Sequence, residues 1–123
     1  MSLQQVHGKF KVFAGPLAAD KTLGKLADDV AAFAKDKAAK SIGVEYLESL
    51  KQLVVTLGYR DDEEAYPVEV KTVLMGKHEI TADSLHKLED EMTAASKKIG
   101  NVICHELYVT DEHDYLMVFL VRK

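Results

Sequence analysis

The sequence has one cysteine, two prolines and no tryptophan among 123 residues. Cys104 stands alone, so the chain can form neither an internal disulfide nor a metal site built from several cysteines. A lone thiol is compatible with a reducing compartment, and the sequence predicts a cytoplasmic protein.

Long apolar runs are also missing. No segment approaches the ~18 apolar residues of a membrane span, and residues 1–9 contain no run of the length that a signal peptide needs. We therefore expect a chain that is neither exported nor inserted in a membrane.

Basic residues are not concentrated anywhere. The chain has 16 Lys and Arg and 20 Asp and Glu, which gives a formal charge of −4, and the two signs are interspersed along the chain. Nucleic-acid binding depends on a concentrated basic surface that releases counterions, so no nucleic-acid partner is expected.

Motifs that define a reaction are absent. Val109 and Ala82 occupy the positions where a metalloprotease motif would place its second histidine after His105 and His78. There is no glycine-rich phosphate loop and no Gly-x-Ser-x-Gly elbow. The sequence therefore predicts no metal and no cofactor.

Length and composition are typical of one globular unit. The chain is 47% hydrophobic and 29% charged, which lies in the ordinary soluble range. A chain of this size can bury a core without disulfides, so residues 1–123 are expected to form a single domain.

The first half begins with an alternating segment, 6–13, that predicts a half-buried strand ended by Gly15 and Pro16. Residues 22–40 then predict an amphipathic helix, with Gly43 as a left-handed residue just beyond its end. The apolar positions at helical spacing are Leu23, Leu26, Val30 and Phe33.

Residues 44–52 fit both a strand and a helical face, and we favour a short strand. After them, 53–59 and 66–75 alternate on either side of an acidic stretch, which predicts a first β-hairpin. In the second half, Thr81 caps a helix and Ile80 packs on Leu85 as a hydrophobic staple.

The chain ends in a second predicted hairpin, with strands near 102–110 and 115–122. The pattern Tyr-x-x-Asp-Glu-x-x-Tyr at 59–66 recurs at 108–115, 49 residues later. Two such copies indicate an internal duplication of a helix followed by a hairpin. The expected fold is α+β: one antiparallel sheet with two helices on one face, in the ferredoxin-like, split βαβ arrangement.

His105 is the candidate catalytic residue, because it alternates with Ile103 and Leu107 on what should be the core side of its strand. A histidine there must be hydrogen-bonded or uncharged, and we favour a buried core histidine over an acid or base. In the second interpretation, His105 shares a ligand pocket with Tyr46 or Tyr108. The acidic turn at 111–114 is interpreted as a solvated turn.

The last strand is apolar on both faces. Helices on only one side of the sheet would leave Met117 and Phe119 in water, and exposed apolar surface of this kind usually marks an interface. We therefore predict a homodimer that covers the open sheet face through these two residues. The alternative is that residues 44–52 fold over that face within one subunit.

The sequence is compatible with two functions. The favoured one is a non-catalytic dimeric module that binds a small molecule or a protein. The alternative is a cofactor-independent enzyme of the dimeric α+β barrel type, with His105 and a tyrosine for proton transfer; only fold analogy supports it. An enclosed pocket that holds His105 with Tyr46 or Tyr108 would favour the enzyme.

Overall fold

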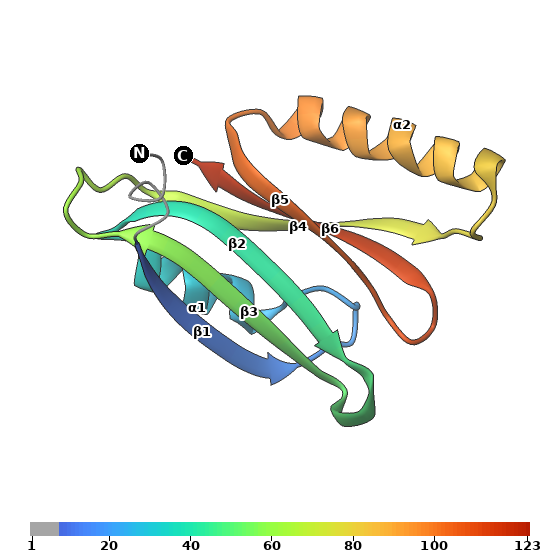
Figure 1. Ribbon diagram of the computed structural model, residues 1–123, viewed down its shortest axis with the longest axis horizontal. Helices are drawn as coiled ribbons and strands as arrows, with labels where there is room; N and C mark the ends of the chain where they lie inside the picture. Colours follow the sequence, from blue (N-terminus) through green and yellow to red (C-terminus); the bar gives the residue numbers. More distant parts are fainter. Residues whose placement is uncertain (1–7) are drawn as a thin grey trace, which may run out of the picture.

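The computed structural model describes residues 8–123, which form six β-strands, two α-helices and one short 3₁₀ helix (Figure 1). Their order is β1 (Lys9–Pro16), α1 (Lys25–Ala34), β2 (Ala38–Leu47), η2 (Glu48–Leu50), β3 (Gln52–Arg60), β4 (Val68–Lys77), α2 (Ala82–Ile99), β5 (Val102–Val109) and β6 (Asp114–Arg122). The predicted α+β class is confirmed. Over residues 8–123, neither helix has the length and apolar character needed to cross a membrane.

The strands form two antiparallel sheets, and the prediction of a single sheet is wrong. Sheet A has the order β1-β3-β2, and sheet B has the order β4-β6-β5. Each half of the chain therefore contributes strand, helix, strand, strand, with its last strand in the middle. Because the outer strands are both antiparallel to the middle one, they run parallel to each other, as in a split β-α-β unit.

The predicted first hairpin is also wrong. Both of its strands exist, but Val55 of β3 is paired with Phe13 of β1 and Val44 of β2, while β4 pairs with β6. Alternation shows that a segment is a strand, not which strand it pairs with. The two copies of the tyrosine pattern are therefore not structurally equivalent. Residues 59–66 connect β3 of sheet A to β4 of sheet B, whereas residues 108–115 contain the turn of the β5–β6 hairpin.

Helix α1 is shorter than the predicted 22–40. Its buried residues are Leu26, Val30 and Ala34, and the chain then turns into β2. The following alanine-rich and lysine-rich segment suits a helix locally, yet Ala38 and Ala39 are fully buried in a strand. Packing thus overrides helix propensity, and Gly43 lies within β2 instead of capping a helix.

The boundaries elsewhere agree better with expectation. The strand favoured for 44–52 is confirmed in part, as β2 runs to Leu47 before η2. β1 is a strand as predicted but continues through Pro16, which lies in an edge strand where its missing donor is tolerated. Val6 and His7 of the predicted strand lie outside the described residues.

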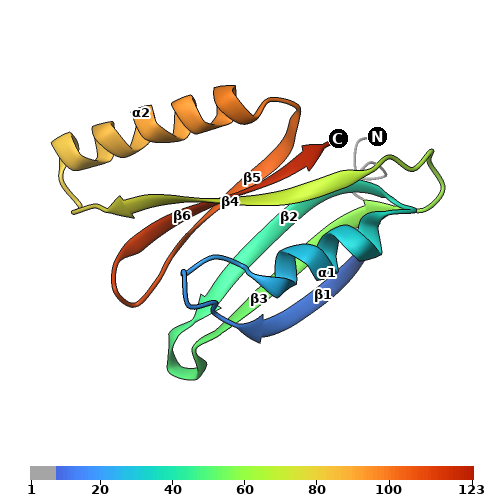
Figure 2. The same ribbon diagram turned by 180° about the vertical axis from the view of Figure 1, so that it is seen from behind.

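The main core fills the wedge between the two sheets. The sheets meet along β2 and β5, and α1 packs on sheet A and against β4 of sheet B (Figure 2). β3, the central strand of sheet A, supplies Leu53, Val55 and Leu57 to this core. β6, the central strand of sheet B, supplies Leu116, Val118 and Leu120.

Helix α2 covers the other face of sheet B. Its Leu88 packs with a second buried cluster that includes Met117 and Phe119, of which 2% and 1% of the surface is exposed. The prediction that these two side chains lie on an open face is therefore wrong. Neither a second subunit nor residues 44–52 is needed to cover them, so the dimer prediction loses the observation on which it was based.

The start of α2 shows a further difference from the sequence prediction. Thr81 is the N-cap as predicted, and its Oγ1 accepts a hydrogen bond from the Ser84 backbone N–H at 3.2 Å. Ile80, however, is 79% exposed, so the predicted hydrophobic staple with Leu85 is not formed.

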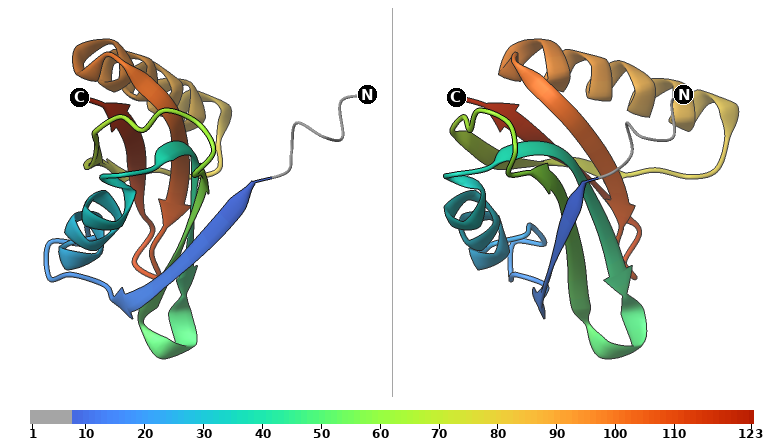
Figure 3. Two further views of the ribbon diagram at one scale, coloured as in Figure 1. Left: turned by 90° about the vertical axis from the view of Figure 1, so that its left-hand side faces the viewer. Right: turned by 60° about the vertical axis from the view of Figure 1, so that its left-hand side comes forward.

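One sheet face remains open among residues 8–123. Sheet A carries α1 on its inner face, and no helix or strand lies over its outer face, which turns toward the viewer in Figure 1 and is seen nearly edge-on in Figure 3. Phe10 and Val12 project from this outer face and are 66% and 59% exposed.

Candidate functional site

His105 lies on the α2 side of β5, and its side chain is exposed. The core interpretation of this histidine is therefore wrong. A bulge between Val102 and Cys104 ends the alternation with Ile103, which packs into the other cluster. The ring is exposed because α2 packs on buried side chains of β4 and β6, and β5 lies at the sheet edge.

Tyr108 projects from the opposite face of β5 into the main core. Its hydroxyl donates a hydrogen bond to the Lys21 carbonyl oxygen at 3.0 Å, and burial raises the pKa of the phenol above its ordinary value. The Tyr46 hydroxyl donates to Asp111 Oδ1 at 3.2 Å. The structure therefore does not bring His105 together with Tyr108, and both tyrosines connect distant segments of the chain.

His105 instead contributes to a groove between α2 and β5 that has a volume of about 430 Å³. Ligand pockets generally start at about 300 Å³. The residues that line this α2–β5 groove are Met92, Thr93, Ser96, Lys97, His105, Met117 and Phe119.

The groove divides into an apolar part and a polar part. Met92 is the partly exposed apolar residue, and the nearly fully buried Met117 and Phe119 of β6 lie beneath the groove. Thr93, Ser96 and Lys97 have the i, i+3, i+4 spacing that places side chains on one side of a helix, and they line the groove together with His105. None of the lining residues is acidic. The groove thus offers hydrogen-bond donors and positive charge beside an apolar surface.

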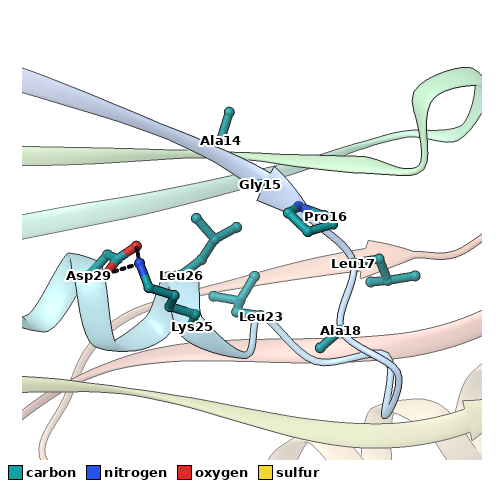
Figure 4. A pocket seen from close by; sticks show the side chains of 9 residues that line it. All are labelled: Ala14, Gly15, Pro16, Leu17, Ala18, Leu23, Lys25, Leu26 and Asp29. Atoms are coloured by element: carbon teal, nitrogen blue, oxygen red, sulfur yellow. Dashed lines mark hydrogen bonds and ion pairs between the residues drawn. The ribbon is translucent and has the colours of Figure 1, made fainter.

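A second pocket of about 340 Å³ lies between the end of β1 and the start of α1 (Figure 4). Leu23 and Leu26 form its apolar wall. Its charged residues, Lys25 and Asp29, pair with each other at 3.2 Å. Since these two charges neutralise each other, this pocket has less to orient a polar ligand than the α2–β5 groove.

The acidic turn at 111–114 is held by lysines. Asp111 pairs with Lys51, and Glu112 pairs with Lys21. Asp114 Oδ1 lies 3.1 Å from Lys77 Nζ, and its Oδ2 lies 3.6 Å from Lys21 Nζ. Over residues 8–123, no group of three or more His, Cys, Asp or Glu side chains is placed to hold a metal ion. The turn carboxylates serve as ion-pair partners, although Asp114 is buried instead of solvated.

Asp114 makes stability depend on pH. The hydrogen bond from Lys77 and the charges of both lysines lower the pKa of Asp114 below its ordinary value. This carboxylate therefore stabilises the fold above its unfolded pKa of about 3.9, and the contribution is lost as the pH falls through the lower folded pKa. We expect Asp114→Asn to reduce the change in urea midpoint between about pH 5 and pH 2. Glu64→Gln, in the exposed connection before β4, is the control; equal pH profiles for all three proteins would contradict this role.

His78, which was considered in the sequence only for the absent metalloprotease motif, has a buried side chain. Its side chain is 6% exposed, with Nε2 2.8 Å from the Met75 carbonyl oxygen and Nδ1 3.2 Å from Ser84 Oγ. Ser84 Oγ also accepts the Glu79 backbone N–H at 3.1 Å, which leaves its own proton for His78 Nδ1. This network joins the end of β4 to the first turn of α2, so the serine acts in helix capping.

Cys104 lies half-buried where the two sheets meet. Its Sγ accepts a hydrogen bond from the Ile42 backbone N–H at 3.1 Å, and burial raises the pKa of the thiol. A raised pKa lowers the thiolate fraction, so the thiol is a weak nucleophile. Its role is to join β5 to β2.

Comparison of the chain with protein-family models, curated proteins and solved structures finds no match.

Proposed function

We propose that the protein is a non-catalytic binding module whose α2–β5 groove takes a small amphipathic anion, such as a medium-chain carboxylate. The observation that carries the proposal is the combination in one groove of Lys97 and His105 with Met92, above an apolar floor of Met117 and Phe119, without any acidic lining residue. An apolar ligand body would lie on Met92, above the nearly fully buried Met117 and Phe119, and its carboxylate would accept hydrogen bonds from the polar side.

The separation of His105 from Tyr108 supports binding over catalysis. Proton transfer between a substrate and a histidine–tyrosine pair needs both groups within hydrogen-bond reach of the reacting atoms. The two side chains project from opposite faces of β5, and Tyr108 is bonded to a backbone carbonyl oxygen. We therefore keep His105 as a ligand-binding residue and give the tyrosines a structural role.

A titration with octanoate tests the proposal. Backbone NMR shifts are expected to move at residues 92–97 and 103–107 and to saturate at millimolar octanoate. Octanol has a similar chain without the charge, and it should bind several-fold more weakly because it lacks the charge-assisted hydrogen bonds.

Matched lysine variants separate the site from general surface charge. Lys97→Met should weaken octanoate binding by about threefold or more, the size expected for an exposed charged contact. Lys87→Met removes the same charge from an exposed position of α2 that does not line the groove, and its affinity should be unchanged. His105→Leu should also weaken binding while leaving the urea midpoint within the range of a surface substitution. Shifts spread evenly over the chain, or equal losses for both lysine variants, would rule the groove out.

The shared order of strands in the two halves supports an origin by duplication of one split β-α-β unit, which differs from the αββ unit expected from the tyrosine repeat. The single thiol of Cys104, half-buried and without a disulfide partner, supports a cytoplasmic location.

A further inference from the structure

We propose that the outer face of sheet A is a self-association surface that binds the same face of a second copy of this chain. The two sheets of the molecule differ in one respect that leads to this proposal. Each carries a helix on one face, but the second face of sheet B is buried in the main core, whereas the second face of sheet A is uncovered among residues 8–123 (Figure 3).

The outer face of sheet A has a ridge and a trough. The ridge follows the edge strand β1, where Phe10 and Val12 are 66% and 59% exposed. The trough follows β2. Ser41 and Phe10 pair with the same residue of β3 from its two sides, and Gly43 and Val12 do so two residues further along. Around Gly43 there is nothing within 4 Å of the position that a Cβ would occupy.

A twofold axis parallel to the strands makes this face complementary to itself. Such an axis, placed between two copies, lays β1 of one copy over β2 of the other and β3 over β3. Phe10 and Val12 then enter the trough at Ser41 and Gly43 of the second copy, and the reciprocal contacts form by symmetry. Face-to-face sheets keep their strand directions within about 30° of each other, which this arrangement satisfies.

Charge does not oppose the contact. The register places Phe10, Val12, Ala14, Pro16, Ser41, Gly43, Glu45, Leu47, Gln52, Val54, Thr56, Gly58 and Arg60 on this face. Two of them are charged. Glu45 lies on β2 at one side of the face, and Arg60 lies at the end of β3, where its guanidinium is paired with Asp62 and Glu63. The Lys9 and Lys11 side chains belong to the opposite, α1 side of β1. A second copy therefore meets a surface with few charges, and the positive one is balanced by neighbouring carboxylates.

The small size of the face indicates a weak dimer. Strands ~4.8 Å apart with ~3.3 Å per residue give a three-stranded face of roughly 15 by 26 Å, or about 400 Å² before side-chain relief is counted. A standard interface buries about 800 Å² on each partner. The expected dimer is therefore weak, with a dissociation constant of roughly 10 to 500 μM.

Sedimentation equilibrium over about 10 μM to 1 mM tests the proposal, and the wild-type chain should change from monomer to dimer across that range. Gly43→Thr fills the trough with a residue that suits a strand, so it should keep or raise the urea midpoint while it weakens the dimer at least tenfold. Phe10→Lys should weaken it similarly by removing the ridge. Ile80→Lys removes a side chain that is 79% exposed away from this face, and dimerisation should be unchanged.

The competing modes of association give different results. A dimer that pairs the free edges of β1 would survive Gly43→Thr, since that residue lies on the far strand of the sheet. Survival of the dimer in this variant, or a wild-type chain that stays monomeric at 1 mM, would overturn the proposal. Octanoate binding in the α2–β5 groove lies on the other sheet, so either result leaves the proposed function to its own test.

Discussion

Replacing Phe119 with alanine is expected to reduce the free energy of unfolding by about 3–5 kcal/mol, because the ring is fully buried and its removal leaves a cavity. Phe119 lies in the middle strand of sheet B and packs under α2 with Met117 and Leu88. The loss is a large share of the roughly 5–15 kcal/mol that stabilises a typical domain. Urea unfolding at micromolar protein, followed by circular dichroism, measures it.

Phe10→Ala is the matched control, since the same side chain is 66% exposed on sheet A. At micromolar concentration we expect it to change stability by less than about 1 kcal/mol. If Phe119 instead lay on an open face, as its sequence pattern suggested, its replacement would change association and not stability. Similar unfolding midpoints for the two variants would show that α2 does not cover this face.

Replacing Val30 with aspartate should nearly abolish the folded state. Val30 is fully buried on α1, where the helix faces the main core between the two sheets. An unpaired charge in such a position costs several kcal/mol, and the apolar burial of valine is lost as well. We expect destabilisation of more than about 4 kcal/mol.

The control places the same charge on the same helix. Ala32 is exposed, so Ala32→Asp should cost no more than about 1 kcal/mol, mainly through lower helix propensity. Circular dichroism and urea unfolding compare the two variants. A folded, cooperative Val30→Asp protein with a nearly normal midpoint would mean that α1 does not pack in the wedge between the sheets.

The sequence by itself determined the elements whose signals are local. Helix α2 could be placed because Thr81 caps it and its apolar residues recur at helical spacing, and both are properties of neighbouring residues. The β5–β6 hairpin was found for the same reason, since alternation and a short polar turn lie within one stretch of chain. The α+β class followed from these local patterns.

Strand pairing was decided only by the tertiary structure. β3 and β4 follow each other and alternate as hairpin partners do, but β3 is paired with β1 and β2, whose contacts come from other parts of the chain. The limit of α1 was decided in the same way: Ala38 and Ala39 favour a helix locally and are buried in β2. Long-range burial outweighs local propensity in both cases.

The candidate site depended on the same distinction. The pattern around His105 placed it with Ile103 and Leu107 on the core side, but a bulge puts Ile103 on the other face. The exposure of His105 follows from the position of α2 over β4 and β6, which no local pattern specifies. Alternation likewise showed that β6 is apolar on both faces, while the helix that covers Met117 and Phe119 precedes β5 in the chain and is brought over them by the fold. Which residues alternate is a property of the chain, and what covers them is a property of the packed fold.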